Sequence, residues 1–172
     1  MKIPHKLFVT RPLFKDERGS TQLLQCPTYP FADNELTHGK APTQIILSQT
    51  NPYTGRGLHF QKKNPLFQII SVIHGEIIEC LVQRDLNENN IQSYSKKIKS
   101  TDENNTFMVP AGWAHGFYTM SNHATLLYMV WGKREIADEY GLNLKSKVFK
   151  FIDKPLRDKI TLNKRDANYE HI

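Results

Sequence analysis

The sequence predicts an all-β fold, a jelly-roll-like β-barrel with few short helices, and three features support this prediction. Apolar runs of about four to eight residues recur along the chain, turn-forming residues separate them, and a sustained helical period is missing. The 172 residues are enough for one domain with a continuous core, and no repeat or linker divides them. We therefore expect a single domain over residues 1–172.

Each predicted strand is an apolar run bounded by turn residues. In chain order the predicted strands cover residues 43–48, 66–73, 76–82, 93–98, 106–109, 116–120 and 124–131. The pair His74 and Gly75 predicts a tight hairpin turn, and the Asn-rich segments 87–90 and 102–105 predict loops. Weak helical patterns at 31–38 and 164–171 predict two short helices.

The composition is that of an ordinary soluble protein. Hydrophobic residues make up 39% of the chain and charged residues 23%, and no apolar run approaches the length of about 18 residues that a bilayer span needs. Arg11 and Pro12 interrupt the N-terminal sequence before a secretory signal could form. We expect a cytoplasmic protein without a membrane partner.

Charge and cysteine content narrow the ligand class. The net charge of +6, with many Lys and Arg residues near the C-terminus, favours an anionic small ligand such as a nucleotide diphosphate. No basic helix with interleaved aromatic residues accompanies this charge, so we expect no nucleic-acid partner. Cys26 and Cys80 lack the spacing of zinc ligands, and we expect both to be free thiols.

Two segments each place a histidine beside a glycine in a strand-like run. Residues 56–61 read RGLHFQ and contain His59, and residues 110–117 read PAGWAHGF and contain His115. Because glycine leaves room for a close approach, both imidazoles could reach one cavity. This pattern indicates a reactive site. We expect Trp113, Trp131, His74 and His123 to be structural or surface residues.

The motifs resemble those of the dTDP-4-dehydrorhamnose 3,5-epimerase family, nucleotide-sugar epimerases with a cupin-type jelly roll that work as homodimers. The resemblance follows the family's order through segments 16–19 (DERG), 56–61, 74–76 (HGE), 110–117, 127–128 (LY) and 164–166 (KRD). It implies a nucleotide-diphosphate sugar substrate, a homodimer whose N-terminal segments cross to the partner, and no cofactor. The implied reaction inverts C3, with C5 as a second candidate centre, of a nucleotide-linked 4-keto-6-deoxyhexose in deoxysugar or surface-polysaccharide biosynthesis.

Three catalytic residues follow from the resemblance. Inversion beside a ketone needs a base that removes a proton and an acid that returns one from the opposite face. The resemblance implies that His59 is the base, that Asp166 orients it and stabilises the imidazolium, and that Tyr128 is the acid.

The resemblance also implies a set of binding residues. Arg18 and Arg56 suit the diphosphate, because a guanidinium binds phosphate oxygens in a bidentate manner. His115 is expected to donate a hydrogen bond to the sugar or to the enolate oxygen. Glu79 matches an acidic residue that faces the cavity, and Gln44 begins the strand that matches a substrate-binding strand of the family.

Two glutamines stand where related proteins carry a functional residue. Gln68 stands where the family has the lysine that stabilises the enolate, and an amide donates a hydrogen bond without bringing a charge. Unless Lys62 or Lys63 reaches the site, we expect a loss of about 10²–10³ in rate. Gln61 occupies the second position of the His-x-His metal pair of many cupins, so we expect no metal.

Two other functions remain open at this point. A ketoisomerase would need the same first deprotonation, although the sugar ketoisomerases of this fold carry a second histidine where this chain has Gln61. A non-catalytic sugar-nucleotide-binding jelly roll would keep His59 and lose turnover. Solvent-deuterium exchange into the sugar separates these alternatives.

Overall fold

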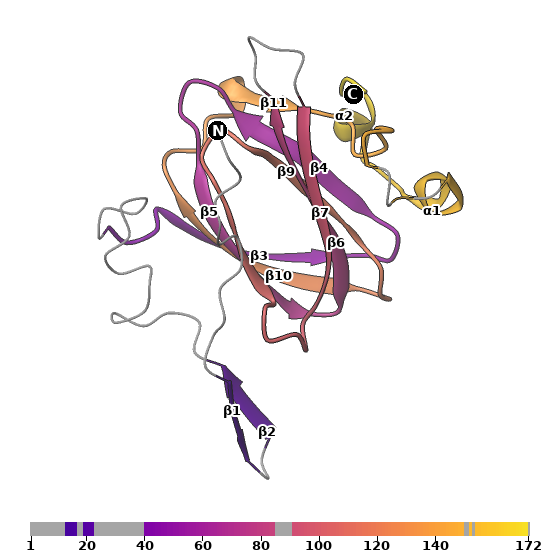
Figure 1. Ribbon diagram of the computed structural model, residues 1–172. Coiled ribbons are helices and arrows are strands. Elements are labelled where there is room, and N and C mark those ends of the chain that lie inside the picture. Colours follow the sequence, from indigo (N-terminus) through magenta and orange to yellow (C-terminus); the bar gives the residue numbers. More distant parts are fainter. Residues whose placement is uncertain are drawn as a thin grey trace.

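The computed structural model describes residues 13–16, 19–22, 40–84, 91–149, 152 and 154–171. Most of these residues form β-strands, and the helices are short (Figure 1). The strands are β1 (Leu13–Asp16), β2 (Gly19–Gln22), β3 (Gln44–Thr50), β4 (Gly55–Gln61), β5 (Phe67–His74), β6 (Glu76–Arg84), β7 (Ile91–Lys99), β8 (Thr106–Val109), β9 (Ala114–Thr119), β10 (Ala124–Trp131) and β11 (Glu139–Gly141). The helices are η1 (Ile136–Asp138), α1 (Lys154–Lys159) and α2 (Lys164–Ala167).

Two antiparallel sheets face each other and enclose the interior of a barrel (Figure 1). The four-stranded sheet has the order β3-β10-β5-β8, and the five-stranded sheet has the order β11-β4-β9-β6-β7. Among the described strands, β1 and β2 pair only with each other, and they lie away from the barrel in Figure 1. The predicted all-β jelly roll with few short helices is confirmed.

The predicted hairpin at His74 and Gly75 is wrong, although each predicted strand is present. Strand β5 belongs to the four-stranded sheet and β6 to the five-stranded sheet, so the chain crosses between sheets at this turn. Gly75 has a φ of +83°, and a Cβ atom there would lie 2.2 Å from the carbonyl oxygen of His123. The turn therefore requires glycine. An apolar pattern marks where a strand ends but not which sheet the next strand joins.

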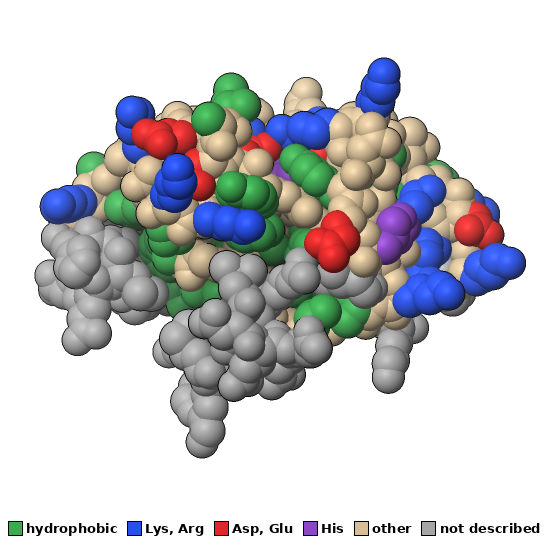
Figure 2. Space-filling model, turned by 90° about the horizontal axis from the view of Figure 1, so that it is seen from above, with side chains coloured by type: hydrophobic (Ala, Val, Ile, Leu, Met, Phe, Trp, Pro, Cys, Tyr) green, Lys and Arg blue, Asp and Glu red, His purple; other side chains and the backbone are tan. Residues whose placement is uncertain are grey.

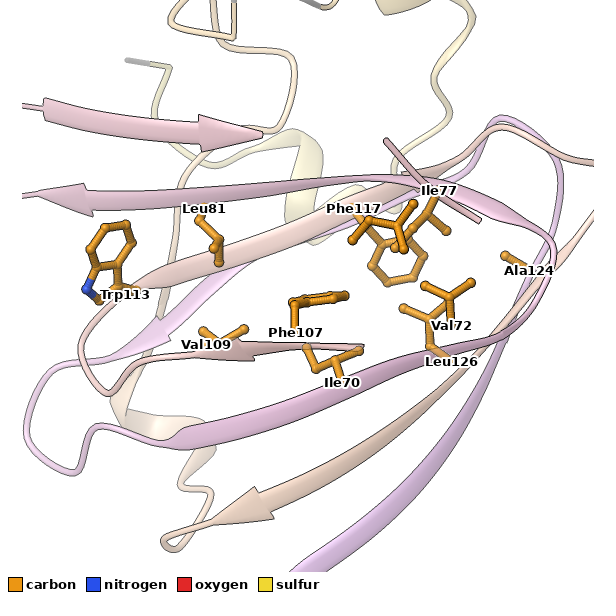
Figure 3. Packing of buried hydrophobic residues seen from close by; sticks show 11 residues of the cluster. Ile70, Val72, Ile77, Leu81, Phe107, Val109, Trp113, Phe117, Ala124 and Leu126 are labelled. Carbon is orange, nitrogen blue, oxygen red and sulfur yellow. The ribbon is translucent and has the colours of Figure 1, made fainter. Parts of the chain in front are cut away.

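The inner faces of both sheets supply the core. Alternate residues of a strand point to opposite faces, and the inward ones pack into one cluster between the sheets (Figure 3). We call this cluster the inner core; its fully or nearly fully buried members include Ile70, Val72, Ile77, Leu81, Phe107, Val109, Trp113, Phe117 and Leu126. The inner core fills one part of the barrel and leaves the polar cavity described below in another.

The C-terminal segment covers the outer face of the five-stranded sheet. Leu58, Cys80 and Tyr118 pack there against Leu144 and other apolar residues of that segment. Helix α2 begins at the predicted residue 164 but ends at Ala167, four residues before the predicted end. The other predicted helix, 31–38, lies outside the described residues, and α1 was not predicted. No helix in the described ranges is both long and apolar enough to cross a bilayer.

Candidate active site

The two histidines of the sequence motifs lie directly opposite each other on neighbouring strands. His59 of β4 pairs with His115 of β9, after a register shift that begins at Arg56. A Cβ atom on Gly57 would lie 2.6 Å from the carbonyl oxygen of His115, and one on Gly116 would lie 2.6 Å from that of Arg56. Both glycines are therefore needed for the close approach of these strands, as the sequence suggested.

His59 forms a hydrogen-bonded pair with Asp166 of α2. Its Nε2 atom lies 2.8 Å from Oδ1 of the carboxylate, and the backbone N–H of Gly57 donates to Oδ2 at 3.1 Å. The Asp166 side chain is fully buried. Burial acts to raise its pKa, but the hydrogen bond and charge of His59, the Gly57 N–H and the Arg165 guanidinium outweigh burial and lower the pKa below its ordinary value.

The start of α2 fixes the position of this carboxylate. The side chain of Asn163 caps the helix by accepting the backbone N–H of Asp166 at 2.8 Å. The N–H of Asn143 donates to the carbonyl of Glu170 at 2.7 Å, which ties the end of the chain to the barrel. Local capping and one backbone contact thus hold a residue of the C-terminal segment against β4.

The contacts of His59 indicate which ring nitrogen can act as a base. A carboxylate only accepts hydrogen bonds, so Nε2 must carry the hydrogen that is donated to Asp166. Nη2 of Arg165 lies 3.0 Å from the same nitrogen, and a guanidinium cannot accept that hydrogen. We therefore assign the lone pair to Nδ1, which is the nitrogen available for proton abstraction.

Tyr128 enters the cavity from the opposite sheet. It lies on β10 in the four-stranded sheet, on the same face as Leu126 of the inner core. Its ring meets that of His115 edge-on, with centroids 6.0 Å apart and planes inclined by 61°. Burial and the nearby carboxylate of Glu79 raise the pKa of Tyr128, with Arg56 opposing them, so the phenol carries its proton at neutral pH.

Glu79 lies behind His115 rather than on the cavity wall. Its Oε1 atom lies 2.9 Å from Nδ1 of His115, and the carboxyl group is buried. Burial raises the pKa of Glu79, and the imidazole opposes that effect. This pairing turns the other nitrogen of His115 away from Glu79, where it can reach a ligand.

One cavity of about 240 Å³ collects most of the predicted site residues. The predicted residues that line it are Gln44, Arg56, His59, Gln68, His115, Tyr128 and Asp166. Arg18 lies outside the described residues. On the face shown in Figure 2, the basic side chains are scattered among polar and apolar ones and do not form one continuous surface.

Arg56 is held at the cavity by strand β3. Its Nε atom donates to the Thr50 hydroxyl at 2.8 Å, and its Nη2 atom donates to the carbonyl of Gln49 at 3.0 Å. The guanidinium has five N–H donors, and these two bonds leave the others for a ligand. A fixed guanidinium at the wall of the cavity suits a phosphate group.

Neither lysine that could replace the missing family lysine reaches the cavity. Gln68 projects into it from β5, whereas Lys62 and Lys63 are not among its lining residues. The ammonium of Lys62 instead lies 3.9 Å from the centre of the Tyr140 ring, where it forms a cation–π contact. Among the described residues, the cations that line the cavity are Arg56, Arg134 and Arg165.

Sequence reasoning missed an ion-pair chain at the cavity. Arg165 Nη1 lies 2.5 Å from one oxygen of Glu139, and Arg134 Nη2 lies 2.7 Å from the other. Burial acts to raise the pKa of Glu139, but the bond from Arg134 and the charges of His59, Arg134 and Arg165 lower it. The position of Arg165 beside Asp166 in the KRD segment was a usable signal, whereas nothing in the sequence singled out Glu139.

Gln61 has a structural role. Its amide nitrogen donates to the carbonyls of Asn64 at 2.7 Å and Lys133 at 3.1 Å, and its oxygen accepts the N–H of Glu135 at 2.8 Å. The amide therefore joins the β4–β5 loop to the segment after β10. Among the residues that the structure describes, no group of three or more His, Cys, Asp or Glu side chains could hold a metal ion.

Comparisons with known proteins identify the family. The family model described as dTDP-4-dehydrorhamnose 3,5-epimerase matches residues 1–172. The dTDP-4-dehydrorhamnose 3,5-epimerase of Methanothermobacter thermautotrophicus is 33% identical over 73 residues, which span 42% of this chain and only 40% of that protein.

Two solved structures have the same fold. The dTDP-4-dehydrorhamnose 3,5-epimerase of Elizabethkingia anophelis gives a TM-score of 0.80 at 24% identity. The match covers 100% of this chain and 94% of the Elizabethkingia chain. The dTDP-6-deoxy-D-glucose-3,5-epimerase of Legionella pneumophila, in complex with dTDP-4-keto-L-rhamnose, gives a TM-score of 0.76 at 25% identity. The match covers 94% of this chain and 85% of the Legionella chain. With the family model matching from end to end, this chain belongs to the dTDP-4-dehydrorhamnose 3,5-epimerase family.

Proposed function

We propose that this protein is a cofactor-independent epimerase that inverts C3 of a nucleotide-linked 4-keto-6-deoxyhexose. One observation carries the proposal: the His59–Asp166 pair and Tyr128 line one cavity from opposite sheets. A sugar ring between the two sheets would present one face to the imidazole and the other to the phenol. Inversion of a carbon requires this two-sided arrangement.

The proton transfers follow from the geometry of the site. Nδ1 of His59 takes the hydrogen from C3, and the electron pair of the C–H bond moves through C4 to the keto oxygen as an enolate. Asp166 stabilises the imidazolium that forms. Tyr128 then gives its hydroxyl proton to C3 from the opposite face, and the C4 carbonyl re-forms. A phenol can protonate this carbon because an enolate is a stronger base than a phenolate.

Binding of the substrate is divided between the charged and the neutral parts of the cavity. Arg56, Arg134 and Arg165 are cations that suit the diphosphate. Gln68 supplies a neutral donor that suits the sugar and the enolate oxygen, and His115 presents its other ring nitrogen to the same cavity. We propose dTDP as the nucleotide, because the related Legionella pneumophila protein binds dTDP-4-keto-L-rhamnose. We propose C5 as a second centre of inversion, since the relatives are named 3,5-epimerases.

Deuterium exchange tests the function. The protein is incubated in D₂O with dTDP-4-keto-6-deoxyglucose, and proton NMR follows the signals of C3 and C5. Loss of the C3 signal together with a new C3 epimer supports the proposal, and loss at C5 adds the second centre. Exchange at C3 that ends in a 3-keto sugar would instead identify a ketoisomerase. Tight binding without any exchange would identify a sugar-nucleotide-binding protein.

The structure favours the epimerase over both alternatives. A ketoisomerase would need a further proton-transfer group near His59, whereas the Gln61 amide is occupied by backbone contacts. A protein that only binds the substrate would have no use for a buried carboxylate aligned on His59. The single-domain organisation and cytoplasmic location expected from the sequence remain predictions.

The homodimer is a further part of the proposal. Among the described strands β3 lies at the edge of its sheet, and its residues Ile45 and Leu47 are 65% and 63% exposed. An exposed apolar edge strand invites pairing with another chain, and a second copy would cover it. The isolated β1–β2 pair is consistent with a segment that crosses to the partner.

The oligomeric state can be tested with matched variants. Light scattering should give twice the chain mass for the wild-type protein at micromolar concentration. Leu47→Lys should shift it to the monomer mass, whereas Ile136→Lys should not, although Ile136 is 81% exposed on η1. A wild-type monomer, or two variants that behave alike, would refute this interface.

A further inference from the structure

Tyr169, which follows α2, packs its ring against the imidazole of His59. The two ring centroids lie 5.8 Å apart and the planes are inclined by 74°, so the contact is edge-on. The hydrogen bond to Asp166 holds Nε2 of the imidazole but lets the ring rock about that atom. A second contact restricts this motion, because two aromatic rings prefer a defined relative orientation. Tyr169 therefore restrains the part of the His59 ring that Asp166 leaves free.

Gly141 leaves room for the Tyr169 ring beside His59. A Cβ atom on Gly141 would lie 2.1 Å from Cε2 of Tyr169 and 2.4 Å from its Cζ, so the ring lies directly on the bare backbone of β11. Gly141 is not among the glycines with a positive φ, so glycine serves here to provide space. Gly141 is also the partner of His59 in the pairing of β11 with β4. A ring packed on Gly141 is thereby placed beside the imidazole.

Tyr169 and Asp166 belong to one short segment that is fixed to the barrel. The N–H of Tyr169 donates to the carbonyl of Asp166 at 3.4 Å. The next residue, Glu170, forms a parallel bridge with Leu142, which directly follows β11. The segment thus brings two groups to His59, a carboxylate at Nε2 and an aromatic ring.

Neither core packing nor substrate contact explains Tyr169. Among the described residues, it belongs to none of the apolar clusters and does not line the catalytic cavity. Burial raises the pKa of its hydroxyl, the carboxylates of Glu139 and Asp166 add to this effect, and Arg165 opposes it, so the phenol is neutral near pH 7. A neutral ring that touches the base and not the cavity acts on the reaction through the position of the base.

We propose that Tyr169 is a positioning residue: its ring, packed on Gly141, holds the plane of the His59 imidazole in the orientation in which Nδ1 faces the substrate. This inference rests on the proposed function, because it takes His59 to be the base. A misplacement of about 1 Å at a reacting group costs up to about 10²-fold in rate. Loss of the ring should therefore slow proton removal and leave substrate binding unchanged.

Exchange kinetics with matched variants test the proposal. In D₂O with dTDP-4-keto-6-deoxyglucose, Tyr169→Phe keeps the ring and should exchange C3 at the wild-type rate. Tyr169→Ala loses the ring, and kcat for exchange should fall about 10- to 100-fold with KM unchanged. Tyr140→Ala is the control and should match the wild type, because Tyr140 packs against Phe60 and not against His59. A wild-type kcat in Tyr169→Ala, or a loss confined to KM, would overturn the proposal.

Gly141→Ala disturbs the contact without removing the ring. The added methyl group would displace the Tyr169 ring, so kcat should fall about as far as in Tyr169→Ala. In the Tyr169→Ala background the methyl group has room, and the same substitution should change kcat by less than about 2-fold. Equal losses in both backgrounds would show that Gly141 does not act through Tyr169 and would refute the proposal.

Imidazole NMR separates this proposal from the proposed function, because it needs no turnover. The His59 ring protons, assigned with His59→Asn, should shift in Tyr169→Ala, which lacks the tyrosine ring current, and stay in place in Tyr169→Phe. The N–H signal of the bond to Asp166 should persist in both variants. Unmoved ring protons, or loss of that N–H signal in Tyr169→Ala, would mean that Tyr169 does not orient the ring or merely anchors the segment, and either result refutes the proposal. If the shifts appear but the wild-type protein exchanges no deuterium, Tyr169 still orients His59 and the epimerase function fails.

Discussion

The Nε2 atom of His59 lies 2.8 Å from Oδ1 of Asp166, although 107 residues separate them in the sequence. The carboxylate is held from three sides: by the imidazole, by the backbone N–H of Gly57 and by Arg165. This arrangement favours the His59 tautomer with its lone pair on Nδ1, the nitrogen that acts as the base in the proposed mechanism.

Asp166→Asn should lower the exchange rate by about 10²–10⁴. The amide of an asparagine would present its NH₂ group to Nε2, which favours the imidazole tautomer that carries hydrogen on Nδ1. The base nitrogen would then be blocked, and the stabilisation of the imidazolium would also be lost. Deuterium exchange at C3 measures the effect. Asp158→Asn on α1 is the control and should behave like the wild type, because Asp158 is exposed.

The same carboxylate should make stability depend on acidic pH. The pKa of Asp166 is lowered by folding, so the native state binds fewer protons than the unfolded state, whose pKa is about 3.9. Its contribution to stability is present above that value and is lost as the pH falls through the native pKa. Urea unfolding between pH 6 and pH 3 should therefore show a gap between wild type and Asp166→Asn that narrows with acidity.

Two other acidic groups bear on this comparison, since folding also lowers the pKa values of Asp138 and Glu139. The contribution of Asp138 cancels in the difference between the two unfolding free energies, because it shares no hydrogen-bond partner with Asp166. Glu139 shares Arg165 with Asp166, so the comparison is repeated in a Glu139→Gln background. A gap that stays constant or widens on acidification would contradict the assignment of the carboxylate as charged.

His59→Asn should abolish deuterium exchange, a loss of at least about 10³, without unfolding the protein. The side chain is half-buried at the cavity and is not part of any apolar cluster, so its replacement leaves the core intact. Circular dichroism and thermal unfolding check the fold. His123→Asn is the matched control, because His123 is an exposed histidine that does not line the cavity. Near-normal exchange in His59→Asn would remove His59 from the role of base.

The fold was predictable because its signals are local. Apolar alternation in runs such as 66–73 and 124–131 marks strands wherever they lie in the barrel. The choice of sheet was not predictable, because Gly75 permits a sharp turn whether the next strand pairs with the previous one or crosses over. A hairpin and a crossover of this length have the same sequence pattern.

The candidate site was predictable only in part. His59 and His115 each stand beside a glycine, and this local pattern matches the close approach of β4 and β9. No local sequence pattern pointed to Glu139, because its role depends on two arginines that reach it from separate segments.

Tyr128→Phe should slow the formation of inverted product by about 10²–10⁴ and spare proton removal by His59. Deuterium would then enter C3 with retention of configuration, because only the original face can return a proton. NMR of the C3 centre distinguishes wash-in with retention from inversion. Unchanged inversion in the variant would assign the acid to another donor, such as a water held by His115.

The last prediction concerns Gln68, where the cavity has a neutral amide in place of the family lysine. Gln68 lies on β5 opposite Val130, one inward position along the sheet from the pair that contains Tyr128. An ammonium introduced there would therefore stand near both the enolate oxygen and the phenol. Gln68→Lys should raise the rate of C3 exchange by about 10-fold or more, since a charged donor stabilises an enolate better than an amide does.

Two effects of the new ammonium act together and one opposes them. The positive charge stabilises the enolate and, by lowering the pKa of Tyr128, makes the phenol a better acid, because burial and Glu79 otherwise raise that pKa. The same charge disfavours the imidazolium of His59, although His59 lies on the opposite sheet and Asp166 shields it. Because residue 68 shares a sheet with Tyr128 whereas His59 lies on the other sheet, acceleration should win. Gln68→Met, similar in length but without a donor, should lower the rate instead. A lysine variant that is slower than the methionine variant would show that the enolate oxygen does not face β5, and its charge would then have to be met by His115 or by one of the arginines.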